Sequence, residues 1–261
     1  PENYLADLQR QGIEVLYRPY VKSIPRHLKV RGMEYDLVIL SRADTAVELM
    51  DEARRHCPNA CIIFDTGDLH FLREERLAKL TGDVSARRLA EYRRREELGL
   101  IALADSTLVV SPVERELLIN MVPGADVHII SNIHDIPGRH TCFGDRRDIF
   151  FIGAFSHPPN VDAVLWFCRD ILPLILAKLP ALQFNIIGAS PPVEVRALAS
   201  STVRVLGHVL DLIPYLEGCR LSVAPLRYGA GVKGKVNLSL AHGLPVVGTT
   251  VAVEGMYLQD G

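Results

Sequence analysis

The sequence lacks the features that place a protein in a membrane or outside the cell. No run of apolar residues is long enough to span a bilayer, and the N-terminus shows no secretory pattern. The five cysteines are odd in number and scattered in spacing, which argues against a disulfide framework. Cys57 and Cys61 form the only close pair, and no second pair with metal-ligand spacing follows, so we expect no metal site. These absences predict a cytoplasmic protein.

Net charge and several catalytic motifs are also absent. The 29 Lys and Arg residues nearly balance 31 Asp and Glu residues, which leaves a net charge of −2. Such a chain has no global field that would attract nucleic acid, so we expect no nucleic-acid partner and only local anion sites. Lys235 is followed by Val236 and Asn237, whereas a Walker loop needs Ser or Thr after its lysine, which disfavours a P-loop ATPase. Neither a nucleophile elbow nor the paired-carboxylate motif of a hydrolase is evident.

What the sequence has is an alternation of short apolar runs and longer helical stretches. Hydrophobic residues make up 48% of the 261 positions, enough for two cores of ordinary domain size. The alternation predicts an α/β fold, with parallel sheets covered by helices on both faces. We predict strands at residues 14–17, 36–41, 61–65, 106–111, 127–131, 148–153, 183–188, 203–207, 221–226 and 244–249.

The apolar rhythm breaks once, over residues 132–148, where glycine, proline and charge replace it. This break predicts a linker between an N-terminal domain (1–140) and a C-terminal domain (148–261). Residues 1–12 are predicted to form a helix, so the usual opening strand of the first domain is missing, and the chain stops soon after a strand and its loop. We therefore expect a protein trimmed at both ends.

A glycine-rich cluster of positive charge follows the predicted strand at 221–226. Residues 227–236 (RYGAGVKGKV) place the cations Arg227, Lys233 and Lys235 among three glycines. Glycines let the backbone curl around an anion, and the cations could neutralise a diphosphate that backbone dipoles alone hold weakly. A solvated basic turn is the alternative, because exposed lysines commonly carry no function.

Two further loops of the second domain are predicted to lie at the same sheet edge, where open α/β sheets bind ligands. Gly153 ends its strand and could let the backbone approach a ligand, although most strand-to-helix turns use glycine for conformation alone. In the helix that follows, we expect Asn160 to cap the N-terminus and Asp162 to lie in the first turn. Glu254 follows the last predicted strand, where a carboxylate could accept hydrogen bonds from ribose hydroxyls.

The first domain offers polar residues after two of its predicted strands. The stretch TGDLHFLR (66–73) gathers Asp68, His70 and Arg73, a set in which a histidine could contact a substrate and a carboxylate could orient a hydroxyl. Capping of the helix by Asp68 and simple packing of His70 account for the pattern equally well. A weaker polar cluster ends the preceding strand: Ser41, Arg42 and Asp44.

Three stretches of the second half stand in order over residues 148–261: FIGAFSHPPNVDAVLWF, LQFNIIGASPPVEVRALA and VRVLGHVLDLIPYLEGCRLSVAPLRYGAGVKGKVNLSLAHGLPVVGTTVAVEGM. Together they resemble the nucleotide-sugar-binding half of a group 1 glycosyltransferase (retaining family 4, the GT-B fold). The first half resembles the acceptor half of that family more loosely, through YDLVILSR, IIFDTGDLHFLREERLA and LVVSPVERELL. The stretch IISNIHDIPG resembles the family's crossing between the two domains.

The resemblance implies two Rossmann-like domains with a sugar nucleotide in the cleft between them. It places the diphosphate of this donor against a set of C-terminal residues: Gly153, Arg227, Gly231, Lys233 and Lys235. Glu254 would lie near the ribose or the sugar. The departing nucleotide diphosphate would be stabilised electrostatically, without a required metal and without a cofactor besides the donor substrate.

The resemblance further implies transfer of the sugar, with retention, to a glycan, a lipid-linked sugar or a protein. On this reading His70 and Asp68 are the catalytic candidates, and Arg42 and Arg73 lie on the acceptor side. If the acceptor is lipid-linked, arginines of the charged helix predicted at 86–99 could contact anionic lipid at the inner face of the membrane. A solvated helix with i,i+4 ion pairs is the favoured account of that stretch, because its glutamates nearly balance its arginines.

Two departures from the family pattern leave alternatives open. Many members carry two glutamates eight residues apart, but Ala230 and Leu238 occupy these positions here. An arginine and a lysine common in the loop after the first strand of this domain are also missing, since Ala154 and Phe155 follow Gly153. The alternatives are a catalytically inactive transferase-like domain of a polysaccharide-assembly protein and a sugar-nucleotide epimerase on the same fold.

Overall fold

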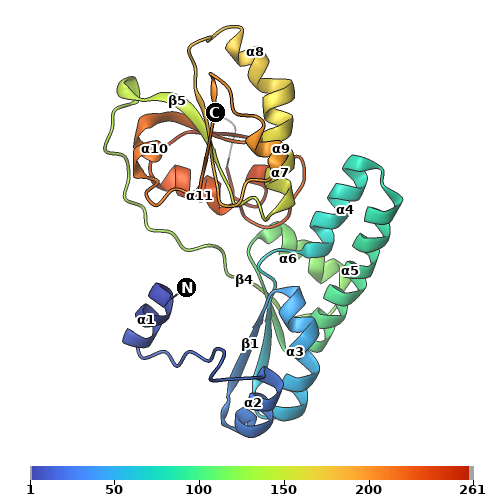
Figure 1. Cartoon of the computed structure of the whole chain (residues 1–261). Helices are drawn as coiled ribbons and strands as arrows, with labels where there is room; N and C mark the ends of the chain where they lie inside the picture. Colours follow the sequence, from blue (N-terminus) through green and yellow to red (C-terminus); the bar gives the residue numbers. More distant parts are fainter. Residues whose placement is uncertain (1, 259–261) are drawn as a thin grey trace.

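The computed structural model describes residues 2–258 and contains two separate parallel β-sheets (Figure 1). We call the part with the first sheet the N-terminal domain and the part with the second sheet the C-terminal domain. The strands of the first sheet are β1 (Leu37–Ser41), β2 (Cys61–Asp65), β3 (Ser106–Val109) and β4 (Val127–Ile129). The strands of the second are β5 (Arg147–Ile152), β6 (Phe184–Ile187), β7 (Val203–Gly207), β8 (Cys219–Ala224) and β9 (Val246–Gly248).

Helices connect the strands in both domains. The N-terminal domain contains α1 (Glu2–Arg10), α2 (Ile24–Arg31), α3 (Ala43–His56), α4 (His70–Thr81), α5 (Val84–Leu103), α6 (Pro112–Met121) and the 3₁₀ turn η1 (Gly32–Glu34). The remaining helices are the 3₁₀ turn η2 (Phe143–Asp145), α7 (Pro158–Trp166), the π-helical segment η3 (Phe167–Ile171), α8 (Leu172–Leu176), α9 (Val193–Arg196), α10 (Ile213–Gly218), α11 (Gly234–Ala241) and α12 (Thr250–Val253).

The first sheet has the strand order β1-β2-β3-β4, with every neighbouring pair parallel. Its core forms because alternate residues of β2, Ile62 and Phe64, are fully buried against the covering helices. In α3 the buried residues recur at helical spacing, at Ala46, Met50 and Ala53. Hydrophobic periodicity of both kinds therefore builds this domain as the sequence predicts.

The second sheet has the order β7-β6-β5-β8-β9, again with all pairs parallel. The four residues of β6 are all buried, as expected of a central strand covered on both faces. The chain builds the sheet outward from β5 in one direction through β6 and β7, then returns to add β8 on the other side. The strand order therefore reverses between β5 and β8, which is where open α/β sheets bind ligands.

One predicted strand is wrong. Residues 13–17 form neither helix nor strand, and β1 is an edge of its sheet among the described residues. Val15 and Leu16 are only partly buried, so this short apolar run does not reach the sheet and gains no ladder of hydrogen bonds. The helix predicted before it is present as α1, and residues 130–142, between the two sheets, contain no helix or strand.

Candidate active site between the domains

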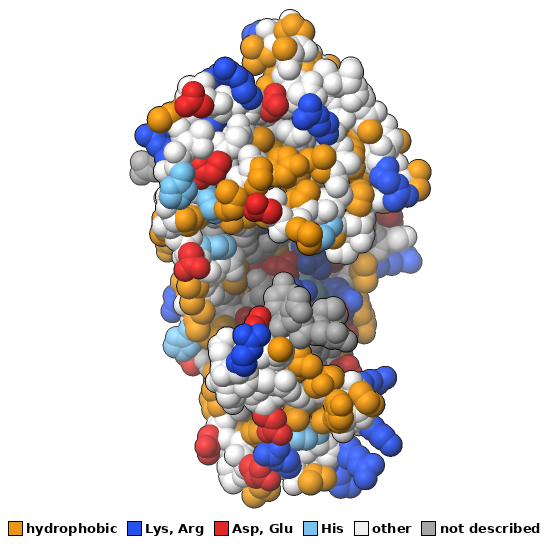
Figure 2. Space-filling model, turned by 60° about the vertical axis from the view of Figure 1, so that its left-hand side comes forward, with side chains coloured by type: hydrophobic (Ala, Val, Ile, Leu, Met, Phe, Trp, Pro, Cys, Tyr) orange, Lys and Arg blue, Asp and Glu red, His pale blue; other side chains and the backbone are white. Residues whose placement is uncertain are grey.

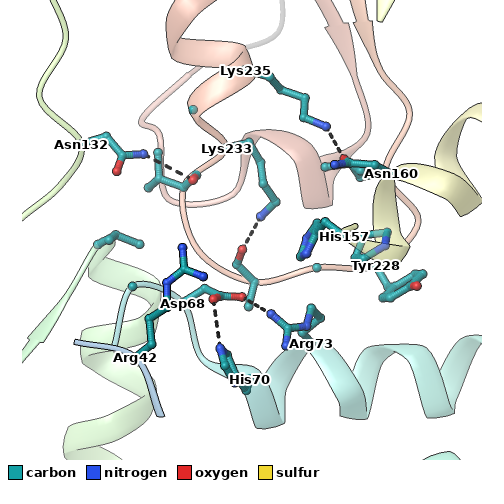
Figure 3. A pocket seen from close by; sticks show the side chains of 18 of the residues that line it. Arg42, Asp68, His70, Arg73, Asn132, His157, Asn160, Tyr228, Lys233 and Lys235 are labelled. Atoms are coloured by element: carbon teal, nitrogen blue, oxygen red, sulfur yellow. Dashed lines mark hydrogen bonds and ion pairs between the residues drawn. The ribbon is translucent and has the colours of Figure 1, made fainter. Parts of the chain in front are cut away.

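A cavity of about 880 Å³ lies between the two domains, at the carboxyl ends of strands from both sheets. Figure 2 shows the molecule hollowed between its two lobes, and Figure 3 shows side chains from both domains turned toward this space. The C-terminal domain contributes the loops after β5 and β8, the two strands that flank the reversal of strand order. The charged and histidine side chains of the lining are Arg42, Asp65, Asp68, His70, Arg73, Glu74, His157, Lys233 and Lys235.

Lys235, in the first turn of α11, lies against apolar and polar groups of the same domain. Its Nζ donates a hydrogen bond to Asn160 Oδ1 and lies 4.3 Å from the centre of the Phe151 ring. Burial, together with repulsion from Lys233, lowers the pKa of Lys235 to about 7. No carboxylate is recorded as a partner of this ammonium among the described residues. The ammonium therefore lacks a counter-ion that an anionic ligand could supply.

Lys233 directly precedes α11, and its side chain folds back to hydrogen-bond the backbone of its own loop. Its Nζ donates to the backbone oxygens of Ala230, at 2.8 Å, and Gly231. Burial lowers the pKa of Lys233 to about 8, against the opposing attraction of Glu254. The backbone can close around this side chain because Gly231 has a φ of +68°, a conformation that favours glycine. The loop thus closes around a lysine ammonium, whereas the sequence predicts that it curls around an anion.

Arg227 lies elsewhere, although the sequence places it beside the two lysines. Its Nε donates to Asp162 Oδ2 at 2.9 Å, its Nη2 pairs with Asp162 Oδ1, and its guanidinium lies 5.7 Å from the Trp166 ring centre. Arg227 is not among the residues that line the cavity. The ion pair with α7 thus directs this side chain away from the site predicted for it.

The start of α7 also differs from prediction. The N-cap is His157, because Pro158 and Pro159 occupy the first turn, where a missing N–H costs no helical hydrogen bond. Asn160 lies inside the helix, and its Nδ2 donates to the Ala154 oxygen at 2.7 Å while its Oδ1 accepts from Lys235. The predicted cap is therefore a side chain that joins Lys235 to the loop after β5.

Asp162 is the fifth residue of α7 and not part of its first turn. The two predicted glycines are explained by close packing. A Cβ on Gly153 would lie 2.7 Å from Asn160 Nδ2 and 2.8 Å from Lys235 Nζ. A Cβ on Gly231 would lie 3.0 Å from the Cβ of Asp68 in the other domain. Neither glycine lines the cavity, and each allows the close approach of a side chain that does.

Glu254 is already engaged by the other domain. Its carboxylate pairs with Arg76 of α4 through Nη1 at 2.8 Å and Nη2 at 2.7 Å, and Glu254 does not line the cavity. The ribose contact predicted for Glu254 is therefore occupied by an arginine in this structure. Arg76 gives no local signal in the sequence, because its partner lies 178 residues away.

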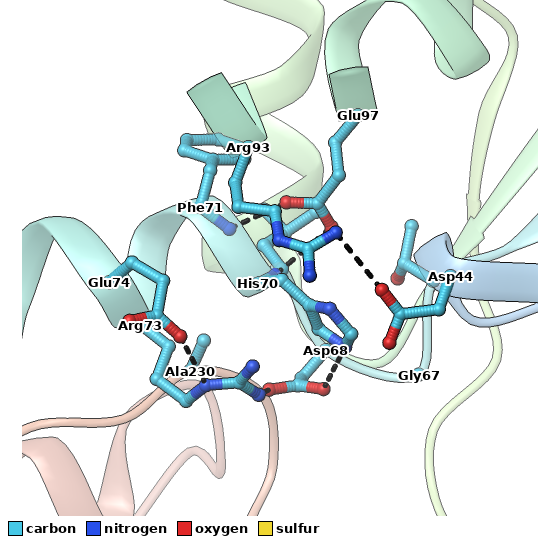
Figure 4. A network of polar contacts seen from close by, with 12 residues as sticks. Asp44, Gly67, Asp68, His70, Phe71, Arg73, Glu74, Arg93, Glu97 and Ala230 are labelled. Carbon is cyan, nitrogen blue, oxygen red and sulfur yellow. Dashed lines mark hydrogen bonds and ion pairs between the residues drawn. The ribbon is translucent and has the colours of Figure 1, made fainter. Parts of the chain in front are cut away.

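On the opposite wall, Asp68 links two of the predicted side chains. It accepts a hydrogen bond from Arg73 at 2.7 Å, and His70 Nε2 lies 3.6 Å from its other oxygen (Figure 4). Burial lowers the pKa of His70, so the ring is neutral at pH 7. All three residues line the cavity. The structure therefore brings this predicted cluster together.

Asp68 does not cap α4. The helix begins at His70, and its first N–H groups are accepted by the carboxylate of Glu97 from α5, with 3.0 Å from His70 N to Oε1 (Figure 4). Glu97 is fully buried, and this burial raises its pKa to about 7 against the effect of the two backbone hydrogen bonds. The predicted solvated face of the charged helix thus contains one glutamate that points inward.

Arg42 ends β1 and lines the cavity in a strained conformation, with a φ of +71°. Within residues 2–258 the structure records no hydrogen bond or ion pair for its guanidinium, whereas Arg73 is paired with Asp68. The other members of the weak cluster have partners: Ser41 donates to Asp65 at 2.8 Å, and Asp44 pairs with Arg93 at 3.0 Å. Of this cluster, only Arg42 lines the cavity.

Two lining residues have no counterpart in the sequence predictions. Burial and the nearby Arg73 lower the pKa of His157 to about 4, so its ring is neutral at pH 7. Burial raises the pKa of Tyr228 to about 12, which keeps the phenol protonated. His157 precedes two prolines at a predicted helix start, and this position at the end of β5 is the one signal that could have identified it.

The sequence model of the family described as "Glycosyl transferases group 1" matches residues 146–261, which contain the entire second sheet and the loops with Asn160, Lys233 and Lys235. The match covers the C-terminal domain and less than half of the whole chain. Among curated proteins, an "Uncharacterized 44.6 kDa protein in cps region" of Klebsiella pneumoniae is 23% identical over 140 residues. That similarity covers 48% of this chain and 36% of the relative, so the chain spans little more than a third of that protein.

Solved structures with similar folds cover both domains. Sucrose-phosphate synthase of Thermosynechococcus elongatus has a TM-score of 0.67 at 15% identity, over 92% of this chain and 64% of that one. HepE of Anabaena, in complex with UDP and glucose, has a TM-score of 0.67 at 14% identity, over 99% and 73%. A TarM mutant of S. aureus, in complex with fondaparinux, alpha-GlcNAc-glycerol and UDP, has a TM-score of 0.61 at 14% identity, over 82% and 41%. The fold is GT-B, with two Rossmann-like domains.

In residues 2–258 no group of three or more His, Cys, Asp or Glu side chains could hold a metal ion. No helix in this part of the chain combines the length and the apolar character needed to cross a membrane.

Proposed function

We propose that this protein is a glycosyltransferase that takes its sugar from a nucleoside diphosphate sugar bound between the two domains. The observation that carries the proposal is the pair of half-buried lysines, Lys233 and Lys235, beside the point where the strand order reverses. The match of the C-terminal domain to the family model supports it, as do the GT-B structures of HepE and TarM that contain UDP. The protein would belong to the transferases of nucleotide-sugar metabolism, with polysaccharide assembly as one setting.

Cleavage of the bond between sugar and diphosphate leaves negative charge on a phosphate oxygen, and the lysines would stabilise that charge. Among the described residues Lys235 has no carboxylate partner, so a diphosphate would be its counter-ion and would favour the protonated ammonium. The N-terminus of α11 has no side-chain cap, which leaves its first N–H groups available to the same anion. In a site shielded from water, these fixed charges act more strongly than they would in bulk solvent.

The acceptor would occupy the N-terminal side of the cavity. There the neutral ring of His70 could exchange hydrogen bonds with a sugar hydroxyl, and Arg73 holds Asp68 beside it. Arg42 provides a cation on the same wall, and no partner of its guanidinium is recorded among the described residues. We propose a glycan, a lipid-linked sugar or a protein as acceptor, and retention, independence of metal and contact with the inner membrane face remain predictions from the resemblance.

Titration calorimetry with UDP, GDP and dTDP tests the donor site. Lys235→Met and Lys233→Met are each expected to weaken the preferred nucleotide about 10- to 100-fold, because each removes a charge-assisted contact. Lys178→Met, at an exposed lysine that does not line this cavity, is the matched control and should leave the affinity unchanged. A wild-type protein that binds none of the nucleotides contradicts the proposal.

Turnover separates the proposed enzyme from the alternatives. Transfer of the sugar from the matching nucleotide sugar to an acceptor, followed by chromatography, is the expected result, whereas rapid turnover of the donor alone would support the epimerase. Release of free UDP, GDP or dTDP only when an acceptor glycan is added would support the transferase most directly. Nucleotide binding without any release would support the inactive binding domain, which the alanine and leucine at positions 230 and 238 keep open.

A further inference from the structure

An arginine of the N-terminal domain holds the loop that carries Lys233. Arg76 of α4 donates through Nη1 to the backbone oxygen of Gly229 at 2.6 Å. The same guanidinium forms a two-point ion pair with the Glu254 carboxylate, at 2.7 and 2.8 Å. Both side chains of the pair are 24% exposed, so the contact is largely shielded from solvent. Arg76 does not line the cavity and cannot act on a ligand directly.

The contact is transmitted to Lys233 through a short stretch of backbone. Gly229 has a φ of +154°, and a Cβ there would lie 3.3 Å from Cε of Lys233. Lys233 in turn donates to the oxygens of Ala230 and Gly231, the next two residues of the loop. Gly231 itself packs against Asp68 in the N-terminal domain. Displacement of the Gly229 carbonyl would therefore move the groups that surround the lysine ammonium.

Arg54 is a matched control for Arg76, because it makes a two-point ion pair and a hydrogen bond to a backbone oxygen within one domain. It pairs with Asp105 at 2.9 Å through each of two nitrogens and donates to the backbone oxygen of Leu103. All three residues belong to the N-terminal domain, and none of them lines the cavity. The Arg76 contacts differ because they form only while the two domains lie together.

We propose that Arg76 is a positioning residue of the donor site, which fixes the diphosphate-binding loop from the opposite domain by holding Gly229 and Glu254. The inference rests on the proposed function, because it assumes that residues 227–236 receive a nucleoside diphosphate. Nucleotide affinity would then depend on the closed arrangement of the domains, and Glu254 would serve the donor through Arg76. Lys233 would bind the diphosphate, while Arg76 would keep Lys233 in place.

Calorimetry with UDP, GDP and dTDP on Arg76 variants tests the inference. Arg76→Ala should weaken the preferred nucleotide about tenfold, a typical effect for a residue that acts through others. The nucleotide affinity of Arg76→Lys should lie between those of Arg76→Ala and wild type, because lysine keeps the charge and loses the two-point geometry. The double variant with Arg76→Glu and Glu254→Arg swaps the two charged partners. It should recover part of the nucleotide affinity that is lost in either single variant. Arg54→Ala should bind as wild type does.

Amide hydrogen exchange without nucleotide provides a readout that does not depend on the proposed function. Exchange over residues 227–234 should be faster in Arg76→Ala than in wild type, and unchanged in Arg54→Ala. Wild-type affinity and wild-type exchange in Arg76→Ala would overturn the inference and leave the donor site standing. A wild-type protein without nucleotide affinity would overturn the proposed function, and with it the role of Arg76 in donor binding. Faster amide exchange in Arg76→Ala would even then show that Arg76 fixes the loop.

Discussion

At the scale of single residues, the candidate site depends on two lysines that are partly shielded from solvent, Lys233 and Lys235. Both predicted lysines of the loop at 227–236 line the cavity, because their position after a central strand of the sheet determines where they lie. The sequence could not place Arg227 or Glu254, whose side chains are directed by partners 65 and 178 residues away. Position in a strand-loop-helix unit is a local property, whereas the choice of an ion-pair partner depends on the tertiary fold.

Burial of Lys235 predicts a measurable cost to stability. Its pKa in the folded protein, about 7, lies below the ordinary lysine value, so the folded state binds fewer protons than the unfolded one. The destabilisation caused by the charged ammonium of Lys235 is at its full size below pH 7. It decreases as the pH rises and is absent above the ordinary pKa of lysine. Lys235→Met, which keeps the contact with Phe151, should raise the free energy of unfolding in urea by about 1 kcal/mol at pH 6 and less at pH 9.

Lys235→Met also loses the hydrogen bond to Asn160, which offsets part of this gain in stability. The decrease of the gain between pH 6 and pH 9 is therefore a sharper measurement than its size at one pH. Lys178→Met, at an exposed lysine, should change the free energy of unfolding by less than about 0.5 kcal/mol at either pH. A Lys235→Met protein that is less stable than wild type at pH 6 would contradict the assignment of a buried, charged lysine.

At the scale of elements, the N-terminus of α4 shows how one helix completes another. The sequence predicts a charged, solvated helix over 86–99, and most of α5 fits that description. Glu97 departs from it, because its carboxylate accepts the N–H groups of His70 and Phe71 inside the domain. Charge patterning along one helix cannot reveal this role, since it depends on where a second helix begins.

Glu97→Ala should destabilise the protein by about 1–3 kcal/mol, because two buried N–H groups lose their acceptor. Urea unfolding measures the change, and Glu91→Ala, at an exposed glutamate on the same helix that pairs with Arg95, should cost about 0.5 kcal/mol or less.

The pKa of Glu97 in the folded state, about 7, is raised, so the cost of its charge is absent at low pH and full above pH 7. Relative to Glu97→Gln, wild type should therefore lose stability as the pH rises from about 4.5, the ordinary glutamate value, to about 7. A difference that does not change with pH would count against a titrating buried carboxylate.

At the scale of the whole molecule, the sequence predicts two α/β domains and a cleft, and the fold has both. The helix-strand alternation determines each sheet separately, whereas the way the domains meet depends on contacts that no local pattern encodes. They include the Arg76–Glu254 pair, the hydrogen bond from Arg76 to Gly229, the packing of Gly231 on Asp68 and the packing of Gly255 on Ser111. The last two involve glycines that leave room for the opposite domain.

Gly255 offers a test of this arrangement that leaves every charge in place. It has a φ of +73°, and an added Cβ would lie 2.6 Å from the Cβ of Ser111, at the start of α6 in the other domain. Gly82 has nearly the same conformation, with a φ of +70°, but nothing within 4 Å of an added Cβ. Alanine at either position should lower the free energy of unfolding by about 1–2 kcal/mol through backbone strain alone.

Only Gly255→Ala should also separate the domains, because the new methyl group cannot fit against Ser111. We therefore expect a larger radius of gyration by small-angle X-ray scattering and a weaker affinity for the preferred nucleoside diphosphate in Gly255→Ala, with neither change in Gly82→Ala. Equal scattering and equal affinity in the two variants would mean that the contact at Ser111 does not determine how the domains meet. Since the lysines and the acceptor-side residues come from different sheets, the distance between them would increase as the domains part.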